Sequence, residues 1–114
     1  MPNNFFITTP IYYVNDIPHI GHAYTSIATD FIARFKRMSG VNTIFLTGTD
    51  EHGQKIQKAA ENNSIDPLSL CDKNSAKFRE LTEVLNLSND DFIRTTEKRH
   101  IDGAKSLWNK LKDN

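Results

Sequence analysis

Residues 18–22 read Pro18-His19-Ile20-Gly21-His22 and place two histidines and a glycine where an extended segment gives way to a helix. Upstream, residues 5–9 are all aromatic or β-branched, which predicts a strand. Pro10 and the run Asn15-Asp16-Ile17-Pro18 then predict a loop. The local order is therefore strand, loop and helix.

The helix is predicted by apolar side chains that recur at three- and four-residue spacing, with Ser39-Gly40 as its stop. These side chains are Tyr24, Ile27, Ala28, Phe31, Ile32, Phe35 and Met38, and they leave Asp30, Arg34 and Arg37 on other faces. In an open α/β sheet, the loop lies beyond the carboxyl end of its strand, where helix amides favour an anion. His19 and His22 can both point at one phosphate chain there, and Gly21 lets a flat ligand approach the backbone.

Two other interpretations of the histidines stay open on the residues alone. A His-x-x-His pair on one helical face can bind a metal, and histidines at a helix start often cap the helix or pack against it. Metal binding is the weaker of these, because a single cysteine and the lack of a nearby Glu-x-x-His leave the ligand set incomplete. We therefore predict no metal site.

A second strand is predicted over residues 41–47, which are largely β-branched and apolar, as in a strand covered by helices on both faces. Asp50-Glu51-His52-Gly53 then lies at its carboxyl end, beside the first loop. Asp50 can bind a substrate ammonium there. The alternative is that Asp50 caps a helix that begins near Gly53.

The two blocks together resemble a known family. Residues 12–24 read Tyr12-Tyr13-Val14-Asn15-Asp16-Ile17-Pro18-His19-Ile20-Gly21-His22-Ala23-Tyr24 and resemble the signature loop of class I aminoacyl-tRNA synthetases, in the form found in the methionyl enzymes. Residues 45–56 read Phe45-Leu46-Thr47-Gly48-Thr49-Asp50-Glu51-His52-Gly53-Gln54-Lys55-Ile56 and are similar to the second strand and following loop of the bacterial methionyl enzymes. The resemblance extends from about Phe5 to the end of the chain.

The resemblance implies the fold and the reaction. The fold is α/β, the first half of a Rossmann-like nucleotide-binding fold with a parallel sheet flanked by helices, and residues 1–114 are part of the catalytic domain. In this family the methionine carboxylate attacks the α-phosphorus of ATP to form methionyl-adenylate and pyrophosphate, and the aminoacyl group then passes to tRNA. Such a step depends on positioning and on stabilising the phosphate charge.

The resemblance also assigns roles to particular residues. His19 and His22 are catalytic donors to the ATP phosphates, with Mg²⁺ sharing the charge, and Gly21 lies under the adenine. On the methionine side, Ile11 offers a backbone carbonyl to the amino group. Tyr13 forms a wall of the side-chain pocket and Asp50 receives the ammonium, whereas we interpret Tyr12 as a packing aromatic.

Several parts of the family have no counterpart in 114 residues. These are the second half of the nucleotide-binding fold, the connective domain with its zinc-binding cysteines, the lysine loop and the anticodon-binding domain. The lysine loop of class I synthetases reads Lys-Met-Ser-Lys-Ser, and its lysines stabilise the pyrophosphate. Lys36-Arg37-Met38-Ser39-Gly40 shares some of these residues but lacks the second lysine, so we interpret it as a helix end. We expect these residues alone to be inactive or nearly so. Two other functions stay open: a non-catalytic remnant or binding module of the same fold, and another nucleotidyl-transfer enzyme with a related phosphate loop.

Composition restricts the partners and the location. The formal net charge is zero, with 14 basic and 14 acidic side chains, so tRNA contacts are expected mostly outside these residues. No apolar stretch approaches the length of a membrane span or resembles a secretory signal, and we expect a cytoplasmic protein. Cys71 is the only cysteine, and its spacing to Leu68 and Phe78 predicts a buried, unreactive thiol.

The remaining residues are expected to form the scaffold. Asp66-Pro67 predicts the start of a helix whose buried stripe is Leu68, Cys71, Phe78, Leu81 and Leu85. Residues 92–95 predict a third short strand. A last helix follows, with Ile101, Ala104, Leu107, Trp108 and Leu111 on one face.

Overall fold

The computed structural model describes residues 3–113 and contains one sheet in which every strand pair is parallel. The elements in chain order are β1 (Asn4–Thr8), β2 (Tyr12–Tyr13), α1 (Ile20–Met38), β3 (Asn42–Asp50), α2 (Gln54–Asn62), α3 (Pro67–Val84), β4 (Asp91–Arg94) and α4 (Lys98–Lys112). The predicted order of strand, loop and helix at the start of the chain is confirmed, as is the α/β class.

Strand β3 is the centre of the sheet, because all three other strands pair with it. Leu46 is paired with both Thr8 and Asp91, so β1 and β4 lie on opposite edges of β3. Near the end of β3, Thr49 is paired with both Tyr12 and Arg94. Strand β2 therefore continues the β1 edge, and its two tyrosines lie beside the last residues of β3.

The structure adds β2 to the predicted strands. Tyr12 and Tyr13 were predicted to lie in a loop, and that prediction was wrong for these two residues. They become a strand only because their backbone pairs with Thr49 and Asp50, far along the chain. A strand of two residues is too short to show the alternation of apolar and polar side chains by which a strand is predicted from sequence.

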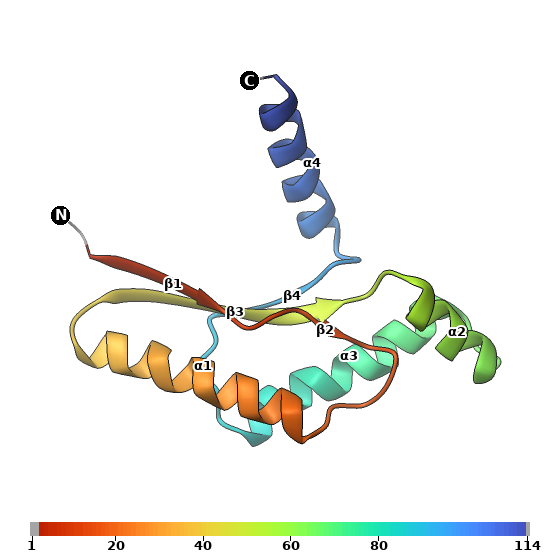
Figure 1. Cartoon of the computed structure of the whole chain (residues 1–114), viewed down its shortest axis with the longest axis horizontal. Helices are drawn as coiled ribbons and strands as arrows, with labels where there is room; N and C mark the ends of the chain where they lie inside the picture. Colours follow the sequence, from red (N-terminus) through yellow and green to blue (C-terminus); the bar gives the residue numbers. More distant parts are fainter. Residues whose placement is uncertain (1–2, 114) are drawn as a thin grey trace.

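Helices α1 and α3 lie on the same face of the sheet (Figure 1). The main cluster of buried apolar residues lies where β2, β4, α2 and α3 meet. It contains Tyr12, Val14, Ile56, Ala60, Leu70, Cys71, Phe78 and Phe92. The predicted start of α3 is confirmed, since the Asp66 carboxylate accepts the Ser69 N–H at 3.0 Å and Pro67 follows at the first helical position.

The buried face of α3 differs in part from the predicted stripe. Cys71 and Phe78 are buried as expected, but Leu68 is 54% exposed, so its predicted burial was wrong. The reason is that the buried face of α3 consists of Leu70, Cys71, Asn74, Ser75 and Phe78, and Leu68 lies to one side of it.

Helix α1 turns its polar side to the sheet. Its buried residues are Ser26, Thr29, Asp30 and Ala33. The apolar stripe that predicts the helix faces outward, with Phe31 71% exposed and Met38 87% exposed. The helix ends at Met38 and Gly40 has a φ of 77°, so Lys36-Arg37-Met38-Ser39-Gly40 is a helix end, as interpreted.

Helix α4 leaves the sheet on the side opposite α1 and α3 (Figure 1). The predicted helix is confirmed, but none of its residues is buried, and Trp108 is 70% exposed. Within residues 3–113 no helix is both long enough and apolar enough to cross a membrane.

Candidate functional site

His19 and His22 cap the start of α1 reciprocally. The Gly21 N–H donates to Nδ1 of His19 at 3.1 Å, and the His19 N–H donates to Nδ1 of His22 at 3.0 Å. The two rings lie with their centroids 3.9 Å apart. The interpretation of the two histidines as helix caps is therefore confirmed. Their two hydrogen bonds satisfy amides at the helix start that would otherwise lack a partner.

This capping sets the tautomer of each ring in its neutral form. A nitrogen that accepts an N–H carries no proton, so each neutral ring has its proton on Nε2. Burial lowers the pKa of His22 below 6.5, and the charge of His19 lowers it further. In its neutral form each ring therefore has one N–H donor, on Nε2, that the helix does not use.

Aromatic packing holds His22 in place. Its ring stands edge-on to Tyr12, with centroids 4.8 Å apart, and edge-on to Phe78 at 4.9 Å. The Tyr12 hydroxyl lies 2.9 Å from the Ser26 hydroxyl of α1. Tyr12 is 8% exposed, which agrees with its interpretation as a packing residue.

Gly21 leaves room for the His19 ring. A Cβ at position 21 would lie 2.9 Å from Cε1 and 3.1 Å from Nδ1 of that ring. Gly21 was predicted to admit a flat ligand to the backbone. In the structure the flat group against its backbone is the His19 imidazole.

A depression of about 360 Å³ brings together four of the predicted site residues: Ile11, Tyr13, His19 and His22. Its full lining is Pro10, Ile11, Tyr12, Tyr13, Asn15, Asp16, Ile17, His19 and His22. A buried amide supports the loop that carries it, because Asn74 Nδ2 donates to the Val14 carbonyl at 2.7 Å. Gly21 and Asp50 are not part of this lining.

Asp50 lies at the end of β3, paired in register with Tyr13. The alternative that Asp50 caps the next helix was wrong, because the residue before α2 is Gly53 and no side chain caps that helix. Instead, Asp50 Oδ1 accepts the His52 N–H at 3.3 Å, which closes a turn over three residues. Tyr13 also borders a second depression, with His52, Gly53, Gln54 and Lys55.

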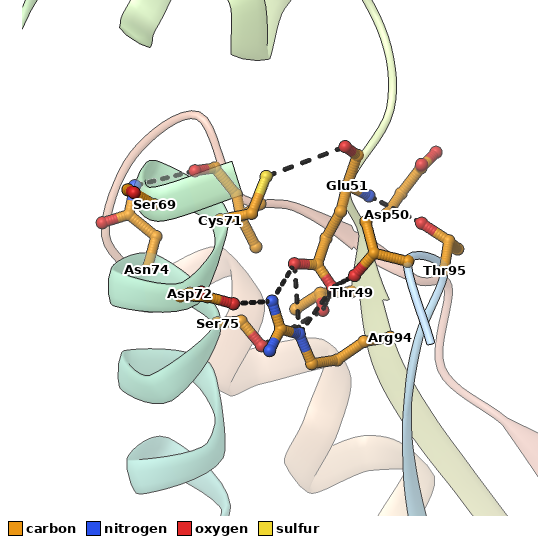
Figure 2. A network of polar contacts seen from close by, with 12 residues as sticks. Thr49, Asp50, Glu51, Ser69, Cys71, Asp72, Asn74, Ser75, Arg94 and Thr95 are labelled. Carbon is orange, nitrogen blue, oxygen red and sulfur yellow. Dashed lines mark hydrogen bonds and ion pairs between the residues drawn. The ribbon is translucent and has the colours of Figure 1, made fainter. Parts of the chain in front are cut away.

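A buried ion pair that was not predicted from the sequence lies next to Asp50. The Glu51 side chain is fully buried, and its carboxylate accepts hydrogen bonds from Nε and Nη2 of Arg94 at distances from 2.6 to 3.1 Å. Arg94 also pairs with Asp72 of α3 (Figure 2). The hydrogen bonds that Arg94 donates, those to Glu51 first, raise the pKa of Arg94. The signal in the sequence is slight: one acid and one arginine, each at the end of a strand.

Cys71 lies in the same network. Its thiol donates to the Glu51 carbonyl at 3.7 Å and is 2% exposed. Burial raises the pKa of this thiol to about 11, and the Glu51 carboxylate adds to the shift. The prediction of a buried, unreactive cysteine agrees with this environment. Within the part of the chain that the structure describes, no three His, Cys, Asp or Glu residues gather as metal ligands would.

A parallel sheet with paired histidines at the helix start beyond its carboxyl edge is the arrangement of a class I tRNA synthetase. Residues 5–114 match the family model described as tRNA synthetases class I (M), and the chain belongs to this family. Its relatives include methionine-tRNA ligases. The Methionine-tRNA ligase of Rickettsia felis is 62% identical over the whole chain, and that of Mesorhizobium japonicum is 54% identical over 96% of it.

The solved structures agree with these relatives. The methionyl-tRNA synthetase of Mycobacterium tuberculosis, in complex with methionyl-adenylate, matches 97% of this chain with a TM-score of 0.93 and 46% identity. The present chain spans 22% of that structure and 22% of the Rickettsia felis relative. It therefore corresponds to about a fifth of these proteins.

Proposed function

We propose that this chain supplies the ATP- and methionine-binding part of a methionine-tRNA ligase, which forms methionyl-adenylate and then charges tRNA. In this proposal residues 1–114 are the first part of the catalytic domain, and most tRNA contacts come from other parts of the ligase. A structural zinc would belong to the connective domain, outside these residues. We also propose a cytoplasmic location.

The observation that carries the proposal is the reciprocal capping of α1 by His19 and His22. Because Nδ1 of each ring is engaged by the helix, the free Nε2–H of each ring is the donor available to a ligand. Two imidazole N–H donors at a helix start suit a phosphate chain, since the helix dipole also favours negative charge there.

The reaction joins a methionine carboxylate oxygen to the α-phosphorus of ATP and breaks the bond to pyrophosphate. His19 and His22 donate hydrogen bonds to the phosphate oxygens as charge moves onto them, and Gly21 lies next to the adenine. Mg²⁺ enters with ATP as part of the substrate and shares the phosphate charge.

Methionine is held on the other side of the same edge. The Asp50 carboxylate pairs with the ammonium, and the Ile11 carbonyl accepts a hydrogen bond from the same ammonium. Tyr13 forms a wall of the side-chain pocket. This placement is supported by the register of β2 and β3, which sets Tyr13 beside Asp50.

The test uses a chimeric ligase, defined as the Rickettsia felis relative with residues 1–114 of this chain in place of its matching segment. Methionine-dependent exchange of pyrophosphate into ATP measures adenylate formation. We expect His19→Ala and His22→Ala each to slow exchange by about 10²- to 10³-fold, as for the loss of one preorganised donor. Methionine affinity should change little, because contacts made only in the transition state appear in the rate.

The matched control is His100→Ala in α4, away from the depression, which should leave exchange unchanged. A large loss of methionine affinity with a normal exchange rate in the His19 and His22 variants would contradict the assignment. An inactive parent chimera, with normal folding, would instead favour a non-catalytic role for this chain.

A further inference from the structure

The turn that carries Asp50 is held from the neighbouring strand by one hydroxyl. Thr95 follows the last residue of β4, and its Oγ1 accepts the Glu51 N–H at 2.8 Å. The same oxygen lies 3.1 Å from Nδ1 of His52. Thr95 is 6% exposed, so water does not replace these contacts readily. One side chain thus binds both residues that follow Asp50.

Asp50 itself is held weakly. Its carboxylate accepts the His52 N–H at 3.3 Å, within the same turn. Its orientation therefore depends on where the backbone of residues 51 and 52 lies. Thr95 fixes that backbone at the Glu51 amide and fixes the His52 ring as well.

The Glu51–Arg94 pair anchors the other side of this turn. Figure 2 shows the Asp50 side chain pointing away from Arg94, while the Glu51 carboxylate points toward it. Arg94 holds Glu51 through its side chain and Cys71 contacts its carbonyl, so the Glu51 N–H is left to Thr95. Without the Thr95 hydroxyl, a buried N–H loses its partner and the turn must shift to find another.

We propose that Thr95 is a positioning residue for methionine: its hydroxyl holds the turn Asp50-Glu51-His52 so that the Asp50 carboxylate meets the ammonium. This inference rests on the proposed role of Asp50. The Thr95 hydroxyl touches no substrate, and it acts only through the backbone of Glu51 and the ring of His52.

The experiment measures KM for methionine and KM for ATP separately in the chimeric ligase. Thr95→Val keeps the shape of the side chain and removes the hydroxyl. We expect KM for methionine to rise about tenfold, the usual effect of leaving a buried donor unpaired next to a binding group. KM for ATP should stay within about twofold, because the histidine site is anchored on α1 rather than on β4.

Two variants separate positioning from a general loss of stability. Thr95→Ser retains the hydroxyl and should restore most of the methionine affinity. Thr43→Val removes another buried threonine hydroxyl, at the opposite end of β3, and should leave both KM values unchanged. If Thr95→Val folds poorly, Thr95→Ala also removes the hydroxyl, and it does so without putting a methyl group in its place.

Asp50→Asn serves as the reference. If it weakens methionine binding but Thr95→Val does not, or if Thr95→Val changes both KM values equally, the positioning role is overturned and the proposed role of Asp50 stands. If neither variant affects methionine, the assignment of Asp50 fails and the inference fails with it. A methionine-specific effect in both, rescued by Thr95→Ser, supports the inference.

Discussion

Gly48 of β3 lies directly against Ile93 of β4, so close that a Cβ at position 48 would stand 2.0 Å from the Ile93 carbonyl oxygen. The two residues are partners in the sheet register. Glycine is therefore required here by the approach of a neighbouring backbone, and not by an unusual φ angle. This contact holds β4 beside the end of β3, where Asp50 and Glu51 follow.

The first prediction concerns this contact. Gly48→Ala should destabilise the chain by about 3 kcal/mol or more, because the obstructing atom belongs to the backbone and cannot rotate away. Gly103→Ala in α4 is the control: its added Cβ meets nothing within 4 Å. It should raise stability by about 0.5–1 kcal/mol through helix propensity. Urea unfolding followed by circular dichroism measures both.

The second prediction concerns the buried ion pair. Arg94→Met leaves the fully buried Glu51 carboxylate without its cation and should cost about 3–5 kcal/mol. The double variant Glu51→Leu with Arg94→Met removes both charges and should recover most of that loss. Asp72→Asn should have little effect, because Asp72 is 60% exposed. Equal losses for the single and double variants would show that packing, rather than charge, matters here.

The third prediction is a pH dependence of stability. Burial lowers the pKa of His22 in the folded chain, whereas the unfolded chain keeps the ordinary value of 6.5. Above about pH 7 the residue is neutral in both states and contributes no pH dependence. Below 6.5 the unfolded chain takes up the proton first, so stability falls as the pH is lowered toward the folded pKa. His22→Gln keeps a capping group at this position without titrating, and should reduce that fall.

Urea unfolding at a series of pH values, run in parallel on the parent chain and on His22→Gln, isolates the contribution of His22. His52 and His100 remain in both proteins and cancel in the difference, which leaves the contribution of His22 together with its electrostatic coupling to His19. Identical pH profiles would mean that His22 protonates in the folded chain as readily as in the unfolded chain.

The fourth prediction concerns Asp50 in the chimeric ligase. Asp50→Asn should weaken methionine binding by about ten- to a thousand-fold, because a charged hydrogen bond to the ammonium is lost. ATP binding should change far less. Calorimetric titration of methionine measures the affinity, and an unchanged value would mean that another group holds the ammonium.

The fifth prediction concerns the exposed apolar faces. The outward face of α1 borders a depression of about 590 Å³, which is lined by Tyr24, Ile27, Ala28, Phe31 and Ile32. Trp108 of α4 is exposed as well. We expect the 114-residue chain to self-associate as its concentration rises. In sedimentation velocity, Phe31→Glu and Trp108→Glu should reduce the association, whereas Ser106→Glu, which adds the same charge to α4, should not. A chain that stays monomeric at all concentrations would contradict this.

The sequence by itself determined the elements whose signals are local. The start of α3 follows from Asp66 and Pro67, the end of α1 from Ser39 and Gly40, and β3 from its run of β-branched residues. The histidine pair at the start of α1 could also be located, because residues three apart on a helix are neighbours wherever the helix packs. These patterns depend only on backbone geometry over a few residues.

The tertiary structure decided what each element touches. Asp30 was placed on a face away from the apolar stripe of α1, yet it is buried, because its carboxylate accepts the backbone N–H of Ser88. Tyr12 and Tyr13 form a strand through partners in β3, and Glu51 meets Arg94 from the far edge of that strand. Such contacts join residues about forty to sixty positions apart, so no local period records them. Local sequence sets the conformation of a segment, but only the folded chain brings a distant partner to each buried polar group.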